Sequence, residues 1–489
     1  MSRVLHDAPS PRARMGVEAS FLWFLLPTLL QTLLGVGVMV PLTTYYLDPA
    51  DLGTVAILTA FAMLVTPLAT TGDNWVLSSH WHATSEADRK ELLFNLLLAN
   101  LGMKVCWATL FWLAAPLLLP RVIRDYRPEY HHYFGLALLG LVAGTFWPTL
   151  SALMVIERAP VSHAVNESLQ WSAGALTTVI GLVVAKLGVL ALFLAPIAAG
   201  LMSMGHGLWY GAGRVAFRPS RRWGKEIMRT GLPAVPFAIM DVLSNSLDRF
   251  VIQRWLDLST LGIYAHSQSY RGMFVTMTKA YSRTMTPTFL ELFAQPKAES
   301  PQQVEQVVSL WYLCVTAGGI VVTLFAPEVI HLLTHGKFDR AAELVPIWFL
   351  LVLAHTAAIP YTQYLLTVRQ NVLLSWSSVG MSVVTMVMVC VATWQFGVLG
   401  ATGAAVAGSF ALHGIRFLLA RRFGCPYGLE PGLLWGLGIV LGVYLLTYWV
   451  GVPFTAKLLL TGVVVATVLV KAAPFCSNGR WATLWPTSK

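Results

Sequence analysis

Apolar stretches of roughly 20 residues recur along the whole chain and are separated by short polar connections. This is the length that a helix needs to cross the hydrocarbon core of a bilayer. The pattern predicts fourteen transmembrane helices, near residues 19–46, 52–77, 92–120, 132–156, 166–187, 189–213, 230–255, 259–290, 304–334, 342–367, 373–394, 399–419, 432–451 and 453–474. Prolines inside several of these segments, such as Pro67 and Pro360, mark expected kinks.

The first apolar segment predicts a retained spanning helix, because it is too long for the apolar region of a signal peptide and lacks a small-residue cleavage site. If the N-terminus lies inside, the inner segments hold twenty Lys and Arg residues and the outer loops hold seven. The positive-inside rule then places both termini in the cytoplasm. The loop with Arg121, Arg124 and Arg127 runs against this trend.

An internal repeat divides the chain. The segment LDPADLG (47–53) follows the first predicted helix, and LDLSTLG (256–262) follows the seventh, at an offset of 209 residues. A GVL triplet recurs at the same offset, at 188–190 and 397–399. Six helices, an even number, separate the copies, so both halves enter the membrane the same way up. The sequence predicts an all-α polytopic membrane protein, with two parallel-repeat six-helix lobes plus two C-terminal helices.

The expected organisation is therefore a cytoplasmic tail (1–18), an N-lobe (19–213), a basic cytoplasmic linker (214–229), a C-lobe (230–420), a C-terminal helix pair (432–474) and a second cytoplasmic tail (475–489). Parallel repeats of this kind are typical of transporters that rock one lobe against the other. The linker interleaves Trp223, Ile227 and Met228 with basic residues, which suits a segment lying on anionic headgroups. A plain positive-inside loop is the alternative.

Composition agrees with a membrane protein, since the mean hydropathy is +0.65 and only 11% of the residues are charged. The net charge of +10 is scattered over many short loops, so it does not indicate nucleic-acid binding. Five widely spaced cysteines support neither a disulfide framework nor a CxxC site. We find no phosphate-binding loop, nucleophile elbow, paired-carboxylate motif or metal-ligand cluster, so we expect no enzyme activity, no cofactor and no metal.

Charged residues interrupt two predicted helices of the C-lobe. On the seventh, Asp241, Ser244, Asn245 and Asp248 follow a single helical stripe, with Arg249 beside it. On the eighth, one face of about 120° carries Gln268, Arg271, Lys279, Ser282, Arg283 and Thr286. A charged side chain near the bilayer centre costs at least roughly 2.5 kcal/mol, so these faces must line water or a partner.

The repeat offset shows that the N-lobe lacks these charges, since Lys279 corresponds to Thr70 and Arg283 to Asn74. This favours a ligand role over one in the shared fold. The alternatives are ion pairs of Asp241 or Asp248 with Lys279 or Arg283, and snorkelling of Arg249 and Arg271. The sign of the charge favours a phosphate or carboxylate ligand. We expect ligand binding by Arg271, Lys279, Arg283, Arg249, Gln268 and Asn245, and ion coupling by Asp241, Asp248 and Asp73.

Two motifs carry a resemblance to a known family. Residues 247–270, LDRFVIQRWLDLSTLGIYAHSQSY, look like a D-x-x-x-I plus L-G-x-Y junction. Residues 325–347, FAPEVIHLLTHGKFDRAAELVPI, are similar to a pattern of P-E-x-I followed by Leu, Gly, an aromatic residue and Ala. With the helix count, these make the chain resemble the polysaccharide transporter family of the multidrug/oligosaccharidyl-lipid/polysaccharide exporter superfamily.

The resemblance implies a flippase that moves an undecaprenyl-pyrophosphate-linked oligosaccharide across the bacterial inner membrane by alternating access, driven by a proton or sodium gradient. The glycan would serve exopolysaccharide, O-antigen or capsule synthesis, and the polymerase or export machinery of that route would be a partner. The last two helices would form a groove for the lipid tail. The almost uncharged first helix differs from that of murein flippases, which disfavours peptidoglycan as the cargo.

Two other classes of function remain as alternatives. A proton- or sodium-coupled drug or cation antiporter of the same superfamily would typically have twelve helices and an acidic cavity. A membrane-embedded polymerase or acyltransferase would need a large outer loop or a buried His/Asp pair, and the sequence has neither.

Lys457, near the outer mouth of the last predicted helix, is expected to snorkel.

Overall fold

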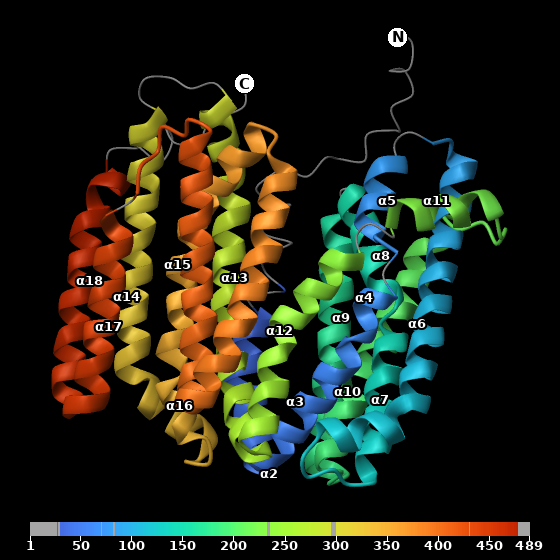
Figure 1. Ribbon diagram of the computed structural model, residues 1–489, viewed down its shortest axis with the longest axis horizontal. Coiled ribbons are helices and arrows are strands. Elements are labelled where there is room, and N and C mark those ends of the chain that lie inside the picture. Colours follow the sequence, from blue (N-terminus) through green and yellow to red (C-terminus); the bar gives the residue numbers. More distant parts are fainter. Residues whose placement is uncertain are drawn as a thin grey trace.

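The computed structural model describes residue 27 and residues 30–69, 71–81, 84–157, 159–231, 235–294, 300–429 and 431–477. Within these ranges every regular element is a helix, and Figure 1 shows the two lobes side by side. Eight helical segments of this described part are long and apolar enough to cross a membrane by themselves. The helices α12 and α13 are not among those eight, because they carry the polar faces found in the sequence.

The N-lobe contains η1 (Gly35–Met39), α2 (Val40–Tyr46), α3 (Pro49–Met63), α4 (Val65–Leu68), α5 (Asp73–His80), α6 (Glu86–Val122), α7 (Glu129–Ala143), α8 (Phe146–Ile156), α9 (Pro160–Val179), η2 (Ile180–Val184) and α10 (Val189–Gly211). The linker forms α11 (Arg221–Gly231). The second predicted span is divided into α3, α4 and α5, with Gly72 at a positive φ of 64° before α5.

The C-lobe contains α12 (Val235–Trp255), α13 (Leu258–Ala294), α14 (Ser300–Thr334), η4 (Asp339–Glu343), α15 (Val345–Thr367) and α16 (Asn371–Arg422). The C-terminal pair contains α17 (Pro431–Leu445), η5 (Leu446–Gly451) and α18 (Phe454–Ser477). The eleventh and twelfth predicted spans both lie in α16, which turns at Gly397 with a φ of +61°. Within the described residues, the predicted spans coincide with helix, and the fold class predicted from the sequence is confirmed. The predicted tail 1–18, the first span up to residue 26, and residues 478–489 of the second tail lie outside the described residues.

The repeated LD-x-x-x-LG motif has one structural role in both lobes. Asp48 caps α3 in a reciprocal capping box with Asp51. Its equivalent, Asp257, accepts a hydrogen bond of 2.8 Å from the backbone N–H of Thr260 at the start of α13. The aspartates therefore begin equivalent helices, which explains why the motif recurs at each of these corners.

The glycines of the same motif bring the two lobes together. A Cβ atom at Gly53 would lie 1.9 Å from the carbonyl oxygen of Leu258, and one at Gly262 would lie 1.7 Å from that of Pro49. These contacts exchange residues that are equivalent under the offset of 209, so a pseudo-two-fold axis runs between α3 and α13. Only glycine allows two helices to approach this closely. The parallel repeat is thereby confirmed.

Further contacts between the lobes lie at the same end of the molecule, where Figure 1 shows α2, α3 and α12 together. The Nζ atom of Lys337, in the corner after α14, is 3.0 Å from a carboxylate oxygen of Asp48. The hydroxyl of Thr44 in α2 donates to the carbonyl oxygen of Leu333 at 3.1 Å. The helices α5 and α11 lie at the opposite end of the N-lobe.

Two expectations from the sequence are corrected by burial. Trp223 and Ile227 of α11 are 2% and 0% exposed and pack in the N-lobe core, so they do not contact headgroups. Lys457 of α18 is 4% exposed, and its Nζ atom lies 2.6 Å from Oε1 of Glu328 in α14. It is held in a buried ion pair and does not snorkel, because α18 packs its polar residue against α14.

Candidate functional site

Three of the predicted residues meet in a network between α12 and α13. The carboxylate of Asp248, which is buried, accepts hydrogen bonds from the hydroxyl of Tyr264, from Nε2 of Gln268 at 2.8 Å and from the backbone N–H of Arg249 at 2.8 Å. The guanidinium of Arg249 donates to Oε1 of Gln268 at 2.9 Å. The short corner between the two antiparallel helices places these residues opposite one another.

Arg271 reaches into a cavity of about 140 Å³ within the C-lobe, between α12, α13, α15 and α16. Its Nη2 atom donates to Oδ1 of Asn245 at 3.2 Å, and its guanidinium carbon lies 5.0 Å from the ring centroid of Trp348. Asp248 lines the same cavity. A cation over an aromatic face retains attraction for a further anion, since the ring does not neutralise its charge.

Lys279 does not line this cavity, although it lies within the face of about 120° on α13 that also carries Gln268 and Arg271. A face that includes Lys279 begins at Gly262, which contacts α3, and continues through Ser269, Gly272 and Thr276 to Lys279, within about 100° of arc at 100° per residue. Beyond the contact at Gly262, the side chains at Ser269 and Lys279 are exposed. The structure gives Lys279 no ion pair with any described carboxylate. The side chains of Asp241 and Arg283 lie outside the described part of the structure.

Asp73, the third predicted carboxylate, belongs to a separate polar cluster in the N-lobe. It contacts the hydroxyl of Thr71, Nδ2 of Asn100 at 2.8 Å and the hydroxyl of Thr149 at 2.7 Å. Asn100 and Thr149 are 3% and 0% exposed. Lys104, one turn beyond Asn100 on α6, acts electrostatically on Asp73. The structure therefore separates Asp73 from the other predicted charges, which all lie in the C-lobe.

The contacts of this cluster outnumber its protons. Thr71 also contacts Oδ1 of Asn100, and Nδ2 of Asn100 contacts the hydroxyl of Thr149, which makes five contacts among four residues. The two hydroxyls and the amide of Asn100 supply only four protons. The single proton of the Thr71 hydroxyl thus faces two acceptors, a carboxylate oxygen of Asp73 and Oδ1 of Asn100, so the cluster has room for one further proton. By contrast, each of the three partners of the Asp248 carboxylate is a donor.

Several residues of these clusters were not found from the sequence. Trp348, Asn100 and Thr149 lie within apolar runs, where an isolated aromatic or polar side chain gives no periodic signal. Tyr264 is the Tyr of the L-G-x-Y motif, but the motif alone gave it no role at the site. Arg416 in α16 is another, and it donates to the hydroxyls of Thr362 and Ser378 at 3.2 and 3.1 Å. An arginine inside a predicted span could have revealed it. Within the described residues, no group of three or more His, Cys, Asp or Glu could bind a metal.

Comparison with known proteins gives one matching family model and several similar structures. A family model described as "Polysaccharide biosynthesis protein" matches residues 46–343. No curated protein matches the chain. A structure of the lipid II flippase MurJ in an inward closed conformation is similar, with a TM-score of 0.70 and 9% identity over 93% of this chain and 98% of that one.

Two transporters of the MATE family are similar as well. An inward-facing multidrug resistance transporter of the MOP superfamily has a TM-score of 0.59 and 14% identity, over 87% of this chain and 98% of that one. A point mutant of the MATE transporter VcmN from Vibrio cholerae has a TM-score of 0.57 and 12% identity, over 84% of this chain and 98% of that one. At these identities the likeness concerns the fold.

Proposed function

Because the chain belongs to the polysaccharide biosynthesis protein family, we propose that it is a flippase for a polyprenyl-pyrophosphate-linked oligosaccharide, acting by alternating access in the bacterial inner membrane. Its fold is that of multi-pass membrane transporters, and the similar MurJ structure is named as a lipid II flippase. Such a protein moves its cargo without chemical change. The cargo would be a repeat unit for exopolysaccharide, O-antigen or capsule synthesis.

One observation carries the proposal. The α13 face that contains Gly262 and Lys279 changes along the helix from a contact with the N-lobe to an exposed polar surface. At Gly262 this face touches the N-lobe, and further along it is exposed, polar and cationic. Exposed Ser269 and Lys279 are unsuited to acyl chains, so this part of the face belongs against water or a polar cargo. A lysine on such a face attracts a diphosphate, whose charge it offsets.

We assign the diphosphate to Lys279, and to Arg283 one turn further along the same helix. Arg271, Asn245, Gln268 and Arg249 would support the site from the C-lobe interior, where Asn245 and Trp348 hold Arg271 in place. With both termini in the cytoplasm, the contacts at Asp48 and Lys337 lie toward the outer surface. The cargo would then enter from the inner side and leave after those contacts open.

Ion coupling is assigned to a proton on Asp73. The proton count of its cluster supports this role. The position of the cluster supports it as well, because the cluster contacts the end of α11, which precedes the C-lobe in the chain. A Cβ atom at Gly231, the last residue of α11, would lie 2.1 Å from the carbonyl oxygen of Thr71. A shift of the Thr71–Asp73 segment on deprotonation would press directly on Gly231, which precedes α12 in the chain. Asp248 would contribute through the charge of the C-lobe cavity.

The proposal is tested by the paired change Lys279→Gln and Arg283→Gln, in liposomes loaded with a fluorescent lipid-linked oligosaccharide. We expect transbilayer movement to fall at least about a hundred-fold, since two charge-assisted contacts of about 1.5 kcal/mol each are removed. The matched control is Arg124→Gln with Arg127→Gln, which removes two exposed cations from the loop between α6 and α7.

Unchanged movement in a folded Lys279/Arg283 variant would contradict the assignment. The antiporter alternative is separated by a resistance assay, since a drug exporter would protect cells and a glycan flippase would not. A change in covalent structure of the lipid-linked sugar during the liposome assay would instead indicate an enzyme.

A further inference from the structure

The basic face of α11 is not used by the proposed function. The helix lies across the end of the N-lobe (Figure 1). Its apolar side, with Trp223 and Ile227, is buried in the N-lobe core. At 100° per residue, Arg221, Lys225 and Arg229 lie within about 80° of arc on the opposite side, and all three are exposed. Because the opposite side of α11 is buried in the N-lobe, these three cations point away from the N-lobe core.

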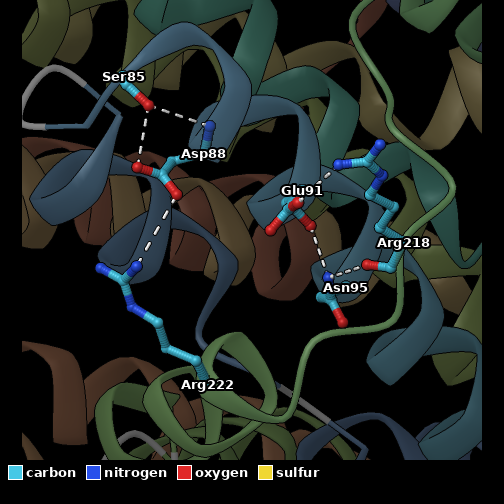
Figure 2. A network of polar contacts seen from close by, with 6 residues as sticks. All are labelled: Ser85, Asp88, Glu91, Asn95, Arg218 and Arg222. Atoms are coloured by element: carbon cyan, nitrogen blue, oxygen red, sulfur yellow. Dashed lines mark hydrogen bonds and ion pairs between the residues drawn. The ribbon is translucent and has the colours of Figure 1, made fainter.

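The segment before α11 is also clamped to the N-lobe, as Figure 2 shows. Nδ2 of Asn95 on α6 donates to the carbonyl oxygen of Arg218 at 3.0 Å, and Oδ1 of the same residue accepts from the backbone N–H of Ser220 at 2.8 Å. The backbone N–H of Ala216 donates to the carbonyl oxygen of Lys90 at 3.1 Å. These bonds attach the segment before α11 to α6 of the N-lobe.

Nearby carboxylates pair with other cations of this region. Asp88 lies 3.8 Å from Arg222, and Glu91 lies 4.0 Å from Arg218 (Figure 2). Glu226 of α11 is 3.6 Å from His80. In the described part of the chain no ion pair involves Arg221, Lys225 or Arg229. The described carboxylates therefore leave these three cations unpaired on one exposed side of α11.

We propose that this array, Arg221, Lys225 and Arg229, binds the phosphate groups of anionic lipids in the inner leaflet. The three residues are spread over two turns, about 12 Å along the helix, so one diphosphate could not engage all of them. A planar layer of headgroups could. Met228 is 41% exposed beside the array and Phe217 is 83% exposed before it, which suits apolar side chains that enter the interface next to cations.

The inference rests on the proposed orientation, because it requires α11 on the cytoplasmic side, where anionic lipids attract basic segments. Its consequence is a division of roles. The N-lobe would be held at the headgroup layer through α11, and the C-lobe would move relative to it from the connection after Gly231.

The test uses the full-length protein in detergent, titrated with short-chain phosphatidylglycerol or phosphatidylcholine. Bound lipid is counted by native mass spectrometry, and the thermal midpoint is followed in parallel. We expect tighter binding of phosphatidylglycerol, and about five-fold weaker binding for each cation removed in the series Arg221→Gln, Lys225→Gln and Arg229→Gln. The matched control, Arg121→Gln, Arg124→Gln and Arg127→Gln, removes three exposed cations from the other end of α6.

Three outcomes would overturn the proposal. The first is equal binding of the two lipids by the unaltered protein, and the second is unchanged phosphatidylglycerol binding by the triple variant. The third is displacement of phosphatidylglycerol by millimolar inorganic pyrophosphate, which would indicate a site for a soluble phosphate compound. None of these readouts measures transport, so failure here would leave the flippase proposal standing, and loss of transport in the Lys279 variant would leave this one standing.

Discussion

At the scale of single residues, the partners of each charge decide its role. Asp248 accepts from three donors, the cluster around Asp73 has more contacts than donor protons, and Lys279 is exposed without a described carboxylate partner. Lys457 shows the opposite case, since its ammonium group is buried against Glu328. Four charged residues of one membrane protein thus have four different surroundings.

The Lys457–Glu328 pair predicts unequal effects of removing either partner. The side chain of Lys457 is 6% exposed and that of Glu328 is 42% exposed. Glu328→Ala leaves a buried ammonium group unpaired and should lower the free energy of unfolding by about 3 kcal/mol. Lys457→Met leaves a carboxylate that water can still reach and should cost about 1 kcal/mol. Thermal unfolding in detergent measures both, and equal losses would mean that the ammonium group is not desolvated.

At the scale of elements, the LD-x-x-x-LG corners link helix initiation to lobe packing. The aspartate of each copy caps a helix, and five residues later the glycine lets that helix cross its equivalent in the other lobe. The two copies of the motif therefore contact each other. A repeat that is detectable in the sequence forms a symmetric contact between α3 and α13.

This contact predicts different results for two glycines of α13. Gly262→Val places atoms against the backbone of α3, where a Cβ already lies 1.7 Å from an oxygen, so the lobes must separate. We expect a loss of about 3 kcal/mol or more in stability, and a larger distance between spin labels on α3 and α13. Gly272→Val is the matched control, because a Cβ there meets nothing within 4 Å. Similar behaviour of both variants would show that the close approach does not hold the lobes together.

At the scale of the whole molecule, two lobes are joined by contacts at one end, and the segment of the Asp73 cluster touches Gly231, the last residue of α11, at the other. Alternating access in this arrangement requires that proton binding change the balance between two lobe arrangements. The cluster contains the carboxylate, and its neighbour Gly72 meets Gly231, the last residue of α11.

Asp73→Asn tests the coupling, because an amide can occupy the same cluster as a permanently neutral group that still donates a hydrogen bond. We expect a folded protein whose transport no longer responds to a pH gradient across the liposome membrane. The unaltered protein should respond. Thr178→Val serves as a control, since it removes a buried hydroxyl of the N-lobe that bonds only within α9. A pH response that survives Asp73→Asn would assign the coupling to another group.

The sequence by itself determined the spanning helices, the two-fold repeat at an offset of 209 and the polar faces of α12 and α13. These features follow from length, period and capping, which act within one helix or between copies of one motif. The burial of Trp223 in the N-lobe and the pairing of Asp73 with Thr149, of Lys457 with Glu328, and of Arg271 with Trp348 were decided only by the tertiary structure. Such partners lie on different helices, tens of residues or more apart, and helix packing alone brings them into contact, so no local pattern of residues encodes the pair.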